Sequence, residues 1–155
     1  MTIKLSTAQI GKSGELFVQY RLLLLGIESA PMCTDTGIDL VAYLPNSKSA
    51  ITIQVKTNLK PKPGGGKGKL ALDWWIPEDS PAEFIALVDL SSGNIWIFTH
   101  KDLLIHAQQH SSGRAHIYMH TESLAKPLKL DRRSHQSDFD EFLLNSNSSF
   151  VPVNC

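Results

Sequence analysis

The sequence is short of cysteine, of long hydrophobic runs and of net charge, and each shortage excludes a class of protein. Cys33 and Cys155 are its only cysteines. They are too few for a disulfide framework or a cysteine-based zinc site, and we expect both to be reduced thiols. The leucine run at 22–25 is far too short to span a bilayer, and the start of the chain lacks the apolar core of a secretion signal. We therefore expect a cytoplasmic protein with no membrane partner.

Charge of one sign is not in excess, because 15 Lys and Arg balance 15 Asp and Glu. This balance excludes a uniformly basic nucleic-acid binder, but it allows a locally basic face because the charges are unevenly spread. A chain of 155 residues with 42% hydrophobic and 19% charged residues fits one soluble domain and argues against disorder. We assign residues 1–145 to this domain and residues 146–155 to a polar C-terminal tail.

Helical spacing of apolar residues predicts a first helix over about 6–25, which Gly26 could end. Two strands are then expected at 38–44 and 50–57, and the turn-forming residues 45–49 make them a hairpin. The Pro- and Gly-rich segment 58–69 predicts a mobile basic loop without regular structure.

The second half of the chain has weaker patterns. Its expected elements are strands at 83–90 and 94–100 that form a second hairpin, a short helix at 101–109, a strand at 115–120 and a helix at 138–145. Helices at both ends with strands between them predict an α/β or α+β fold, in which helices flank one mixed sheet.

Four polar residues lie where these patterns favour apolar ones: Glu15, Asp39, Gln54 and Lys56. Glu15 falls on the helix stripe that should face the sheet, where a carboxylate is costly unless it is paired or bound to a metal. Asp39 lies early in an otherwise apolar strand. Gln54 and Lys56 share one face of the next strand, because alternate strand residues point the same way.

These residue types are suited to hydrolysis. The carboxylate of Asp39 and the amide oxygen of Gln54 can ligate a hard divalent ion such as Mg²⁺ or Mn²⁺, and Glu15 could contribute through a water. Lys56 would lie about 6–7 Å along the strand from Gln54, at about 3.3 Å per residue. From there it could orient an attacking water or help to remove its proton. Together these groups could hydrolyse a phosphodiester.

The order of these residues resembles the PD-(D/E)XK nuclease superfamily. The segments 14-GE-15, 37-GIDLVAY-43 and 51-ITIQVKT-57 carry the resemblance, which covers about the first 60 residues. It is similar to the branch with glutamine in place of the second acid, which includes Mrr-like restriction enzymes and a group I intron-encoded homing endonuclease of cyanobacterial type. Two departures are that Ile38 replaces the proline of the motif, and that Gln54 brings no charge, so metal affinity should be weak without DNA.

The resemblance implies a restriction-endonuclease-like core and the activity of a metal-dependent endodeoxyribonuclease. It implies that Asp39 and Gln54 are the metal ligands, that Lys56 is the lysine of the motif and that Glu15 is the acid from the helix. The structural alternatives are an exposed Glu15 in an ion pair, a turn role for Asp39 and a solvated strand face for Gln54 and Lys56. Asp35 is a second candidate for the aspartate. The order and spacing of the four residues together favour the catalytic interpretation.

Several basic residues are candidates for phosphate contacts in DNA: Lys60, Lys62, Lys67, Lys69 and Arg114. The alternative is a solvated connector and ordinary surface charge, which also suits Arg132 and Arg133. Trp74 and Trp75 are expected to pack in the core or an interface. The histidines show no zinc-binding motif with a third ligand.

Our hypothesis is a Mg²⁺-dependent endonuclease that acts on double-stranded DNA. One site in one small domain cuts one strand, so we expect a homodimer or a higher homo-oligomer. A homing role is favoured, with restriction or Holliday-junction cleavage as alternatives. The rival classes are an inactive DNA-binding or assembly module on the same fold and an interaction protein independent of nucleic acid.

Overall fold

The computed structural model describes residues 3–34, 36–44, 49–123 and 133–148. Asp35, Arg132 and Cys155, named above, lie outside these residues. The elements in chain order are α1 (Thr7–Leu24), β1 (Glu28–Pro31), β2 (Leu40–Tyr43), β3 (Ala50–Asn58), β4 (Lys62–Pro63), the 3-10 helix η1 (Gly64–Gly66), β5 (Leu70–Pro77), β6 (Phe84–Asp89), β7 (Asn94–Thr99), α2 (His100–His106), β8 (Gln109–Ser111), β9 (Arg114–His120) and the 3-10 helix η2 (Gln136–Phe142).

Helix α1 forms within a residue or two of the predicted bounds, because its start is well capped. The Ser6 hydroxyl accepts a hydrogen bond from the Gln9 N–H at 3.2 Å, and the Gln9 side chain accepts one from the Ser6 N–H at 2.8 Å. This reciprocal pair satisfies two donors that a helix start otherwise leaves unpaired. Val18 and Leu22 are fully buried on its inner face.

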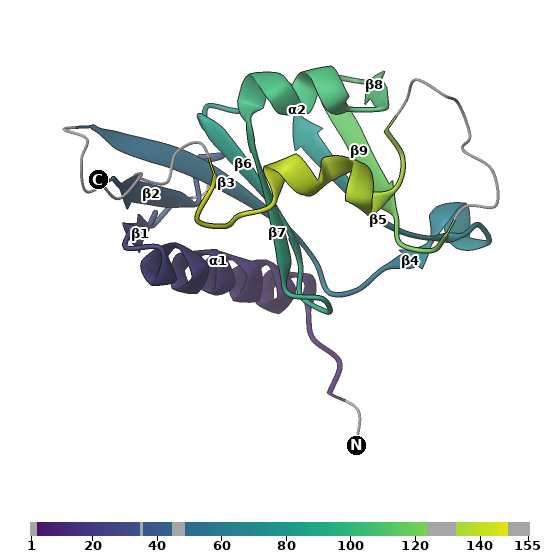
Figure 1. Cartoon of the computed structure of the whole chain (residues 1–155), viewed down its shortest axis with the longest axis horizontal. Helices are drawn as coiled ribbons and strands as arrows, with labels where there is room; N and C mark the ends of the chain where they lie inside the picture. Colours follow the sequence, from purple (N-terminus) through teal and green to yellow (C-terminus); the bar gives the residue numbers. More distant parts are fainter. Residues whose placement is uncertain (1–2, 35, 45–48, 124–132, 149–155) are drawn as a thin grey trace.

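A mixed five-stranded sheet is the middle layer of the molecule (Figure 1). Its strand order is β1-β2-β3-β6-β7, with β3 and β6 parallel and the other neighbours antiparallel. The predicted hairpins are present as β2–β3 and β6–β7. Strand β1 was not predicted, since four largely exposed residues carry no clear alternation. The expected fold class, a mixed sheet flanked by helices, is confirmed.

The expectation of one sheet is wrong, because β4, β5, β9 and β8 form a separate antiparallel sheet. Its longest unexpected strand, β5, contains Trp74 and Trp75. Trp74 is buried as predicted, whereas Trp75 points outward with 39% of its surface exposed. An outward tryptophan beside an inward one hides the alternation that identifies a strand.

The segment 58–69 is also more ordered than predicted. Strand β3 continues to Asn58, β4 pairs with β5, and the glycines form η1. Proline is tolerated in a strand as short as β4, where few backbone donors are needed.

The two later helices differ from their predicted bounds. Helix α2 ends at His106 rather than at 109, because the chain turns into β8. The segment predicted as a helix at 138–145 is instead η2, and its last residues leave the helix to pair with β7. The Leu144 N–H donates to the Ile95 carbonyl at 2.8 Å. Backbone pairing with a strand is a tertiary contact that cannot be predicted from the local sequence.

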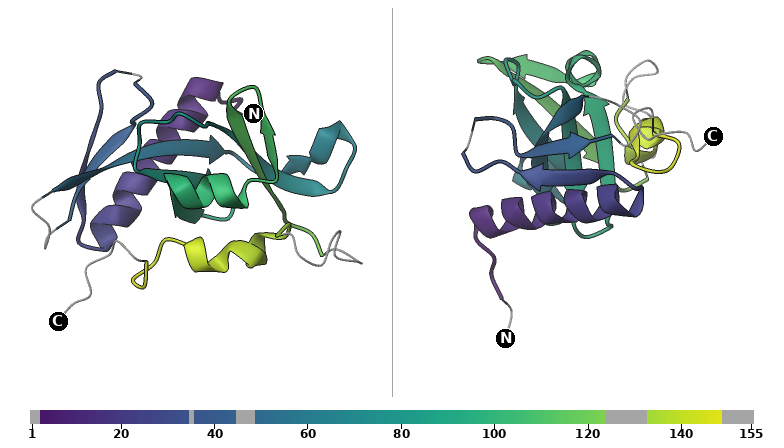
Figure 2. Two further views of the ribbon diagram at one scale, coloured as in Figure 1. Left: turned by 90° about the horizontal axis from the view of Figure 1, so that it is seen from above. Right: turned by 90° about the vertical axis from the view of Figure 1, so that its left-hand side faces the viewer.

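Two hydrophobic clusters hold the layers together. Figure 2 shows these layers, with α1 on one side of the middle sheet and α2 on the other. One lies between α1 and the middle sheet and includes Val18, Leu22 and Ile53. The other lies between the opposite face of the middle sheet, the second sheet, α2 and η2, and includes Trp96 and Phe139. No helix in the described part of the chain is long and apolar enough to cross a membrane.

Candidate active site

Asp39 lies where β2 separates from β3. Its backbone N–H donates to the Ile53 carbonyl at 2.9 Å, and its carbonyl accepts from the Met32 N–H at 2.9 Å. Its carboxylate Oδ2 accepts the Val55 N–H at 2.6 Å. The pairing of β2 with β3 ends at Leu40 opposite Ile53. Beyond this point the Val55 N–H has no partner in the β2 backbone, and the side chain of Asp39 accepts its hydrogen bond instead. The carboxylate is therefore fixed beside the peptide that joins Gln54 to Val55.

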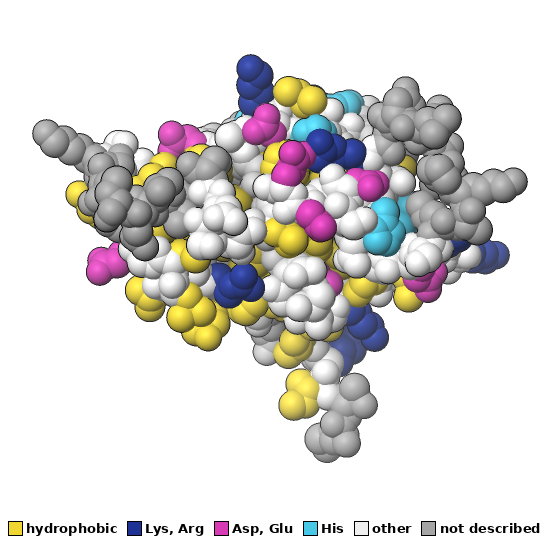
Figure 3. All heavy atoms as spheres, viewed as in Figure 1, with side chains coloured by type: hydrophobic (Ala, Val, Ile, Leu, Met, Phe, Trp, Pro, Cys, Tyr) yellow, Lys and Arg dark blue, Asp and Glu magenta, His cyan; other side chains and the backbone are white. Residues whose placement is uncertain are grey.

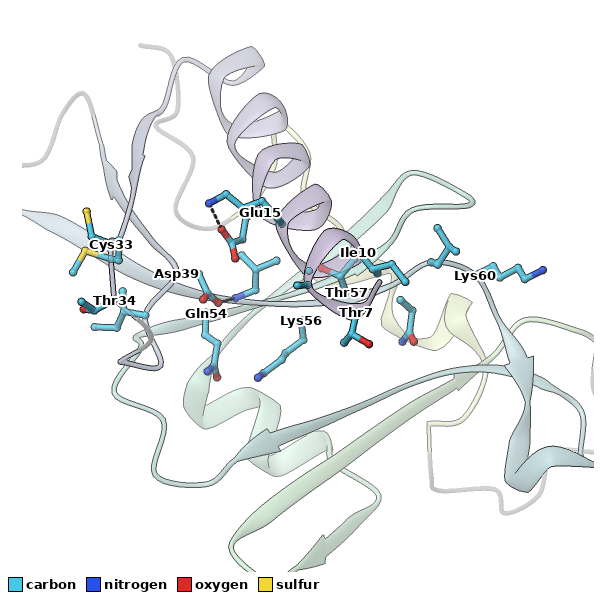
Figure 4. A pocket seen from close by; sticks show the side chains of 18 of the residues that line it. Thr7, Ile10, Glu15, Cys33, Thr34, Asp39, Gln54, Lys56, Thr57 and Lys60 are labelled. Carbon is cyan, nitrogen blue, oxygen red and sulfur yellow. Dashed lines mark hydrogen bonds and ion pairs between the residues drawn. The ribbon is translucent and has the colours of Figure 1, made fainter. Parts of the chain in front are cut away.

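Gln54 and Lys56 point the same way from β3, as the alternation predicted (Figure 4). Gln54 is buried, with 5% of its surface exposed. Its side-chain oxygen accepts a hydrogen bond from the Ser80 hydroxyl at 3.1 Å, which fixes the orientation of the amide. Gly37 lies close by with φ +82°, and an added Cβ would meet the Pro81 ring at 3.0 Å. Glycine is thus required by both the turn and the space.

Lys56 is half-buried and points into the open pocket (Figure 4). Among the described residues, no hydrogen bond or ion pair to its ammonium group is present. A half-buried cation without a partner among these residues is available to an anionic ligand.

A close approach of α1 to β3 brings Glu15 to the site. A Cβ on Gly14 would come within 1.8 Å of the Thr57 hydroxyl oxygen and 2.8 Å of the Thr57 Cβ, so any side chain there would push the helix away. In Figure 4, Glu15 reaches from α1 toward Asp39, on the side of β3 opposite to Gln54 and Lys56. The carboxyl group of Asp39 lies between these two sets of side chains.

Glu15 forms an ion pair with Lys12 at 2.7 Å, with 22% of the Glu15 side chain exposed. The hydrogen bond and the charge of Glu15 raise the pKa of Lys12, and the charge of Asp39 adds a smaller increase. The alternative of an exposed, ion-paired Glu15 is thus realised in part, because Glu15 pairs with Lys12 but is only partly exposed. The same carboxylate lines the pocket.

One open pocket of about 780 Å³ collects the four predicted residues (Figure 4). Its polar and charged lining residues include Lys12, Glu15, Asp39, Gln54, Lys56, Asn58, Lys60 and Lys62. The expected phosphate contacts Lys60 and Lys62 belong to this pocket. Lys67 and Lys69 lie further along the glycine-rich segment, and Arg114 lies beside Glu78 and Asp79 at another part of the surface.

The donor atoms at this pocket suit a hard divalent ion. Two carboxylates and an amide oxygen are the ligand types that Mg²⁺ takes, with waters completing its shell. No cluster of three or more His, Cys, Asp or Glu side chains able to hold a metal occurs among the described residues.

The roles of three residues at the site were not predicted from the sequence. Lys12 adds a fourth lysine to the pocket, Ser80 orients Gln54, and Gly14 allows α1 to approach β3. The helical spacing from Lys12 to Glu15 could have indicated the first. Nothing local to Ser80 signals its role, because its contact with Gln54 spans 26 residues.

Comparison with solved structures shows the fold. The bacterial homing endonuclease I-Ssp6803I is similar over 81% of this chain and 84% of that chain, with a TM-score of 0.56 at 14% sequence identity. The chain has the fold of this nuclease. Hjc, a Holliday junction resolvase from Archaeoglobus fulgidus, matches over 69% of this chain and 82% of that chain, with a TM-score of 0.48 at 17% identity. No protein-family model matches the chain, and no curated protein matches its sequence.

Proposed function

We propose that the protein is a Mg²⁺-dependent DNA endonuclease of the PD-(D/E)XK type, with glutamine in place of the second acid. The observation that carries this proposal is the hydrogen bond from the Val55 N–H to Asp39, which holds the carboxylate beside the strand that bears Gln54 and Lys56. Mg²⁺ bound by Asp39 and Gln54, with Glu15 supporting its shell, would lower the pKa of a water and offset negative charge at the phosphate.

The proposed reaction is hydrolysis. The water oxygen forms a bond to phosphorus, while the bond from phosphorus to one sugar oxygen breaks. One proton leaves the attacking water, and solvent supplies one to the departing oxygen. Lys56 orients the water and assists the removal of its proton, and its charge also favours the extra negative charge that develops on the phosphate. Lys60 and Lys62, at the rim of the same pocket, contact the neighbouring phosphates.

Double-stranded DNA is the proposed substrate, and a homing role is the favoured one. The likeness to a bacterial homing endonuclease over most of both chains supports this choice. A duplex has two strands and the described chain offers one such pocket, so the proposal includes a homo-oligomer that brings two pockets together.

The outer face of α1 supports an interface with a second copy. Four large apolar residues lie within one stripe of this helix, each between 56% and 66% exposed: Leu16, Tyr20, Leu23 and Leu24. In Figure 3, hydrophobic side chains gather along the lower edge of the molecule, where α1 lies. The inner face of the same helix is already packed on the middle sheet. Helices that are apolar on both faces are typically buried on both sides.

The second candidate is an inactive DNA-binding or assembly module. It is favoured by the neutral Gln54, whose oxygen is already engaged by Ser80. Incubation with supercoiled, linear and four-way-junction DNA, with Mg²⁺ and with EDTA, separates the two candidates. An endonuclease cuts at least one substrate in Mg²⁺ and none in EDTA. Salt-sensitive binding without cutting would favour the module.

A further inference from the structure

A second pocket, of about 470 Å³, lies on the solvent face of the four-stranded sheet. Its volume falls within the range of sites for small ligands, about 300–1,000 Å³. His116, Tyr118 and His120 of β9 line it together with Lys62 and Lys69. The intervening residues of β9, Ala115, Ile117 and Met119, are fully buried on the other face of the sheet.

Four rings follow one another across this face, and we call Trp75, His116, Tyr118 and His120 the aromatic row. The rings of Trp75 and His116 are stacked, with centroids 4.2 Å apart and an interplanar angle of 2°. The His116 and Tyr118 centroids are 5.7 Å apart with the ring planes tilted by 48°, and those of Tyr118 and His120 are 5.5 Å apart in an edge-to-face arrangement at 70°. Rings on the solvent side of a strand present apolar faces and edges to a ligand.

Charge at this pocket suits an anion. Lys62 and Lys69 contribute two cations. The carboxylate of Asp73 also lines the pocket, and it contacts His116 Nε2 at 3.3 Å. Burial lowers the pKa of His120, and the charges of Lys69 and His135 lower it further. The lowered pKa of His120 favours its neutral ring. Flat rings beside lysines match the two parts of a nucleotide, a base and a phosphate.

The aromatic row is connected to the candidate active site. Lys62 lines both pockets. Asn58 lines the first pocket at the end of β3, and its side-chain amide donates to the Asp73 backbone carbonyl at 2.7 Å. A DNA strand that passes from one pocket to the other would thus follow Lys60 and Lys62 at the rim of the first pocket toward Lys69 in the second.

We propose that the aromatic row binds an unpaired nucleotide of the DNA substrate, with its base on Tyr118 and its phosphates at Lys62 and Lys69. Paired bases have neighbours on both faces, so only an unpaired or flipped-out base can offer a face to Tyr118. The inference rests on the proposed function for its choice of DNA as the substrate. It adds a substrate class, DNA with an unpaired base near the cut.

The test is equilibrium binding of labelled DNA in EDTA, followed by fluorescence anisotropy. The three probes contain the same duplex. The first is the duplex alone, the second adds a single-stranded tail of four thymidines, and the third adds a tail of four abasic residues. We expect the thymidine tail to bind roughly tenfold tighter than the abasic tail, since base stacking on a ring is worth about 1–3 kcal/mol. Tyr118→Ala should remove this difference, whereas Tyr118→Phe, which keeps the ring, should retain it.

A matched pair of lysine variants tests the phosphate contacts. Lys69→Ala should weaken binding of the thymidine tail. It should also reduce the slope of log K against log salt concentration by about the amount expected for one phosphate contact. Lys67→Ala removes the same charge from the same segment but does not line this pocket, so its effect should be smaller. Thermal unfolding of each variant confirms that the fold is retained.

Equal binding of the thymidine and abasic tails, or a preference that survives Tyr118→Ala in a folded protein, would overturn the inference. The proposed function fails separately. Cleavage that depends on Lys56, together with equal binding of the two tails, refutes the aromatic row alone. Base-dependent binding that Tyr118→Ala removes, without cleavage of any DNA in Mg²⁺, refutes the endonuclease alone.

Discussion

Gly14 of α1 and Thr57 of β3 approach so closely that a Cβ on Gly14 would lie 1.8 Å from the Thr57 hydroxyl oxygen. This contact sets the distance between the helix that carries Glu15 and the strand that carries Gln54 and Lys56. The position of the proposed site therefore depends on the absence of a side chain at residue 14.

Gly14→Ala is expected to destabilise the protein and to reduce cleavage, because the added Cβ would lie within 2.8 Å of three side-chain atoms of Thr57. Overpacking of this kind costs about 1–3 kcal/mol. Gly11→Ala is the matched control, since nothing lies within 4 Å of a Cβ there. It should instead stabilise the helix by up to about 1 kcal/mol. Urea unfolding measures both changes, and a neutral Gly14→Ala would contradict the packing described here.

Ser80→Ala is expected to raise the Mg²⁺ concentration needed for half-maximal cleavage. Loss of the hydroxyl frees the Gln54 amide to rotate. If the lost hydrogen bond weakens Mg²⁺ binding by about 1 kcal/mol, the Mg²⁺ concentration needed rises roughly fivefold. In a Gln54→Ala background the same substitution should change nothing further, because the group that Ser80 positions is gone. An equal effect in both backgrounds would show that Ser80 acts on stability alone.

Leu23→Glu is expected to dissociate the proposed homo-oligomer, because it places a charge in the apolar stripe of α1. Ile105→Glu is the matched control, since Ile105 on α2 is 64% exposed and Leu23 is 62% exposed. Sedimentation equilibrium of both variants and the wild type measures the assembly. A wild type that is monomeric at all concentrations, or loss of assembly in both variants, would refute this interface.

The carboxylate of Asp138 gives a pH-dependent prediction. Backbone hydrogen bonds from Ser134 and His135, both at 2.9 Å, lower the pKa of Asp138 below its usual 3.8. Folding therefore favours the ionised form, and its stabilisation is present above about pH 4 and is lost as pH falls through the lower, folded pKa.

Asp138→Asn should accordingly cost about 1 kcal/mol near pH 7, as loss of a helix cap does. The difference from wild type should shrink as the pH falls below 4. Asp140→Asn, at an exposed position of the same 3-10 helix, should have little effect at any pH. Urea unfolding at pH 7 and at pH 3 measures both variants, and a constant Asp138→Asn deficit would contradict the assignment.

The parts of the fold that the sequence predicted are those with strong local signals. The helix from 7 to 24 has a cap and a buried stripe. The hairpin of β2 and β3 has alternating residues in its strands and turn-forming residue types in the sequence between them. The second sheet was missed because Trp74 and Trp75 disguise the alternation of β5, and because β8 is a short edge strand.

The candidate site divides in the same way. Spacing within one strand was enough to place Gln54 and Lys56 together, and strand order was enough to bring Asp39 beside them. The contact of Ser80 with Gln54 and that of Thr57 with Gly14 arise from packing between distant segments. No local pattern encodes such contacts, so they required the structure.

Cleavage of duplex DNA by Lys56→Ala tests the central claim most directly. Lys101→Ala, an exposed lysine on α2, is the control. We predict that the wild type and Lys101→Ala cut DNA in Mg²⁺ but not in EDTA, and that folded Lys56→Ala is slower by at least about 10²-fold, the usual contribution of a general acid or base. Cleavage by Lys56→Ala at the wild-type rate would contradict the account, because the chemistry would then lie on other residues.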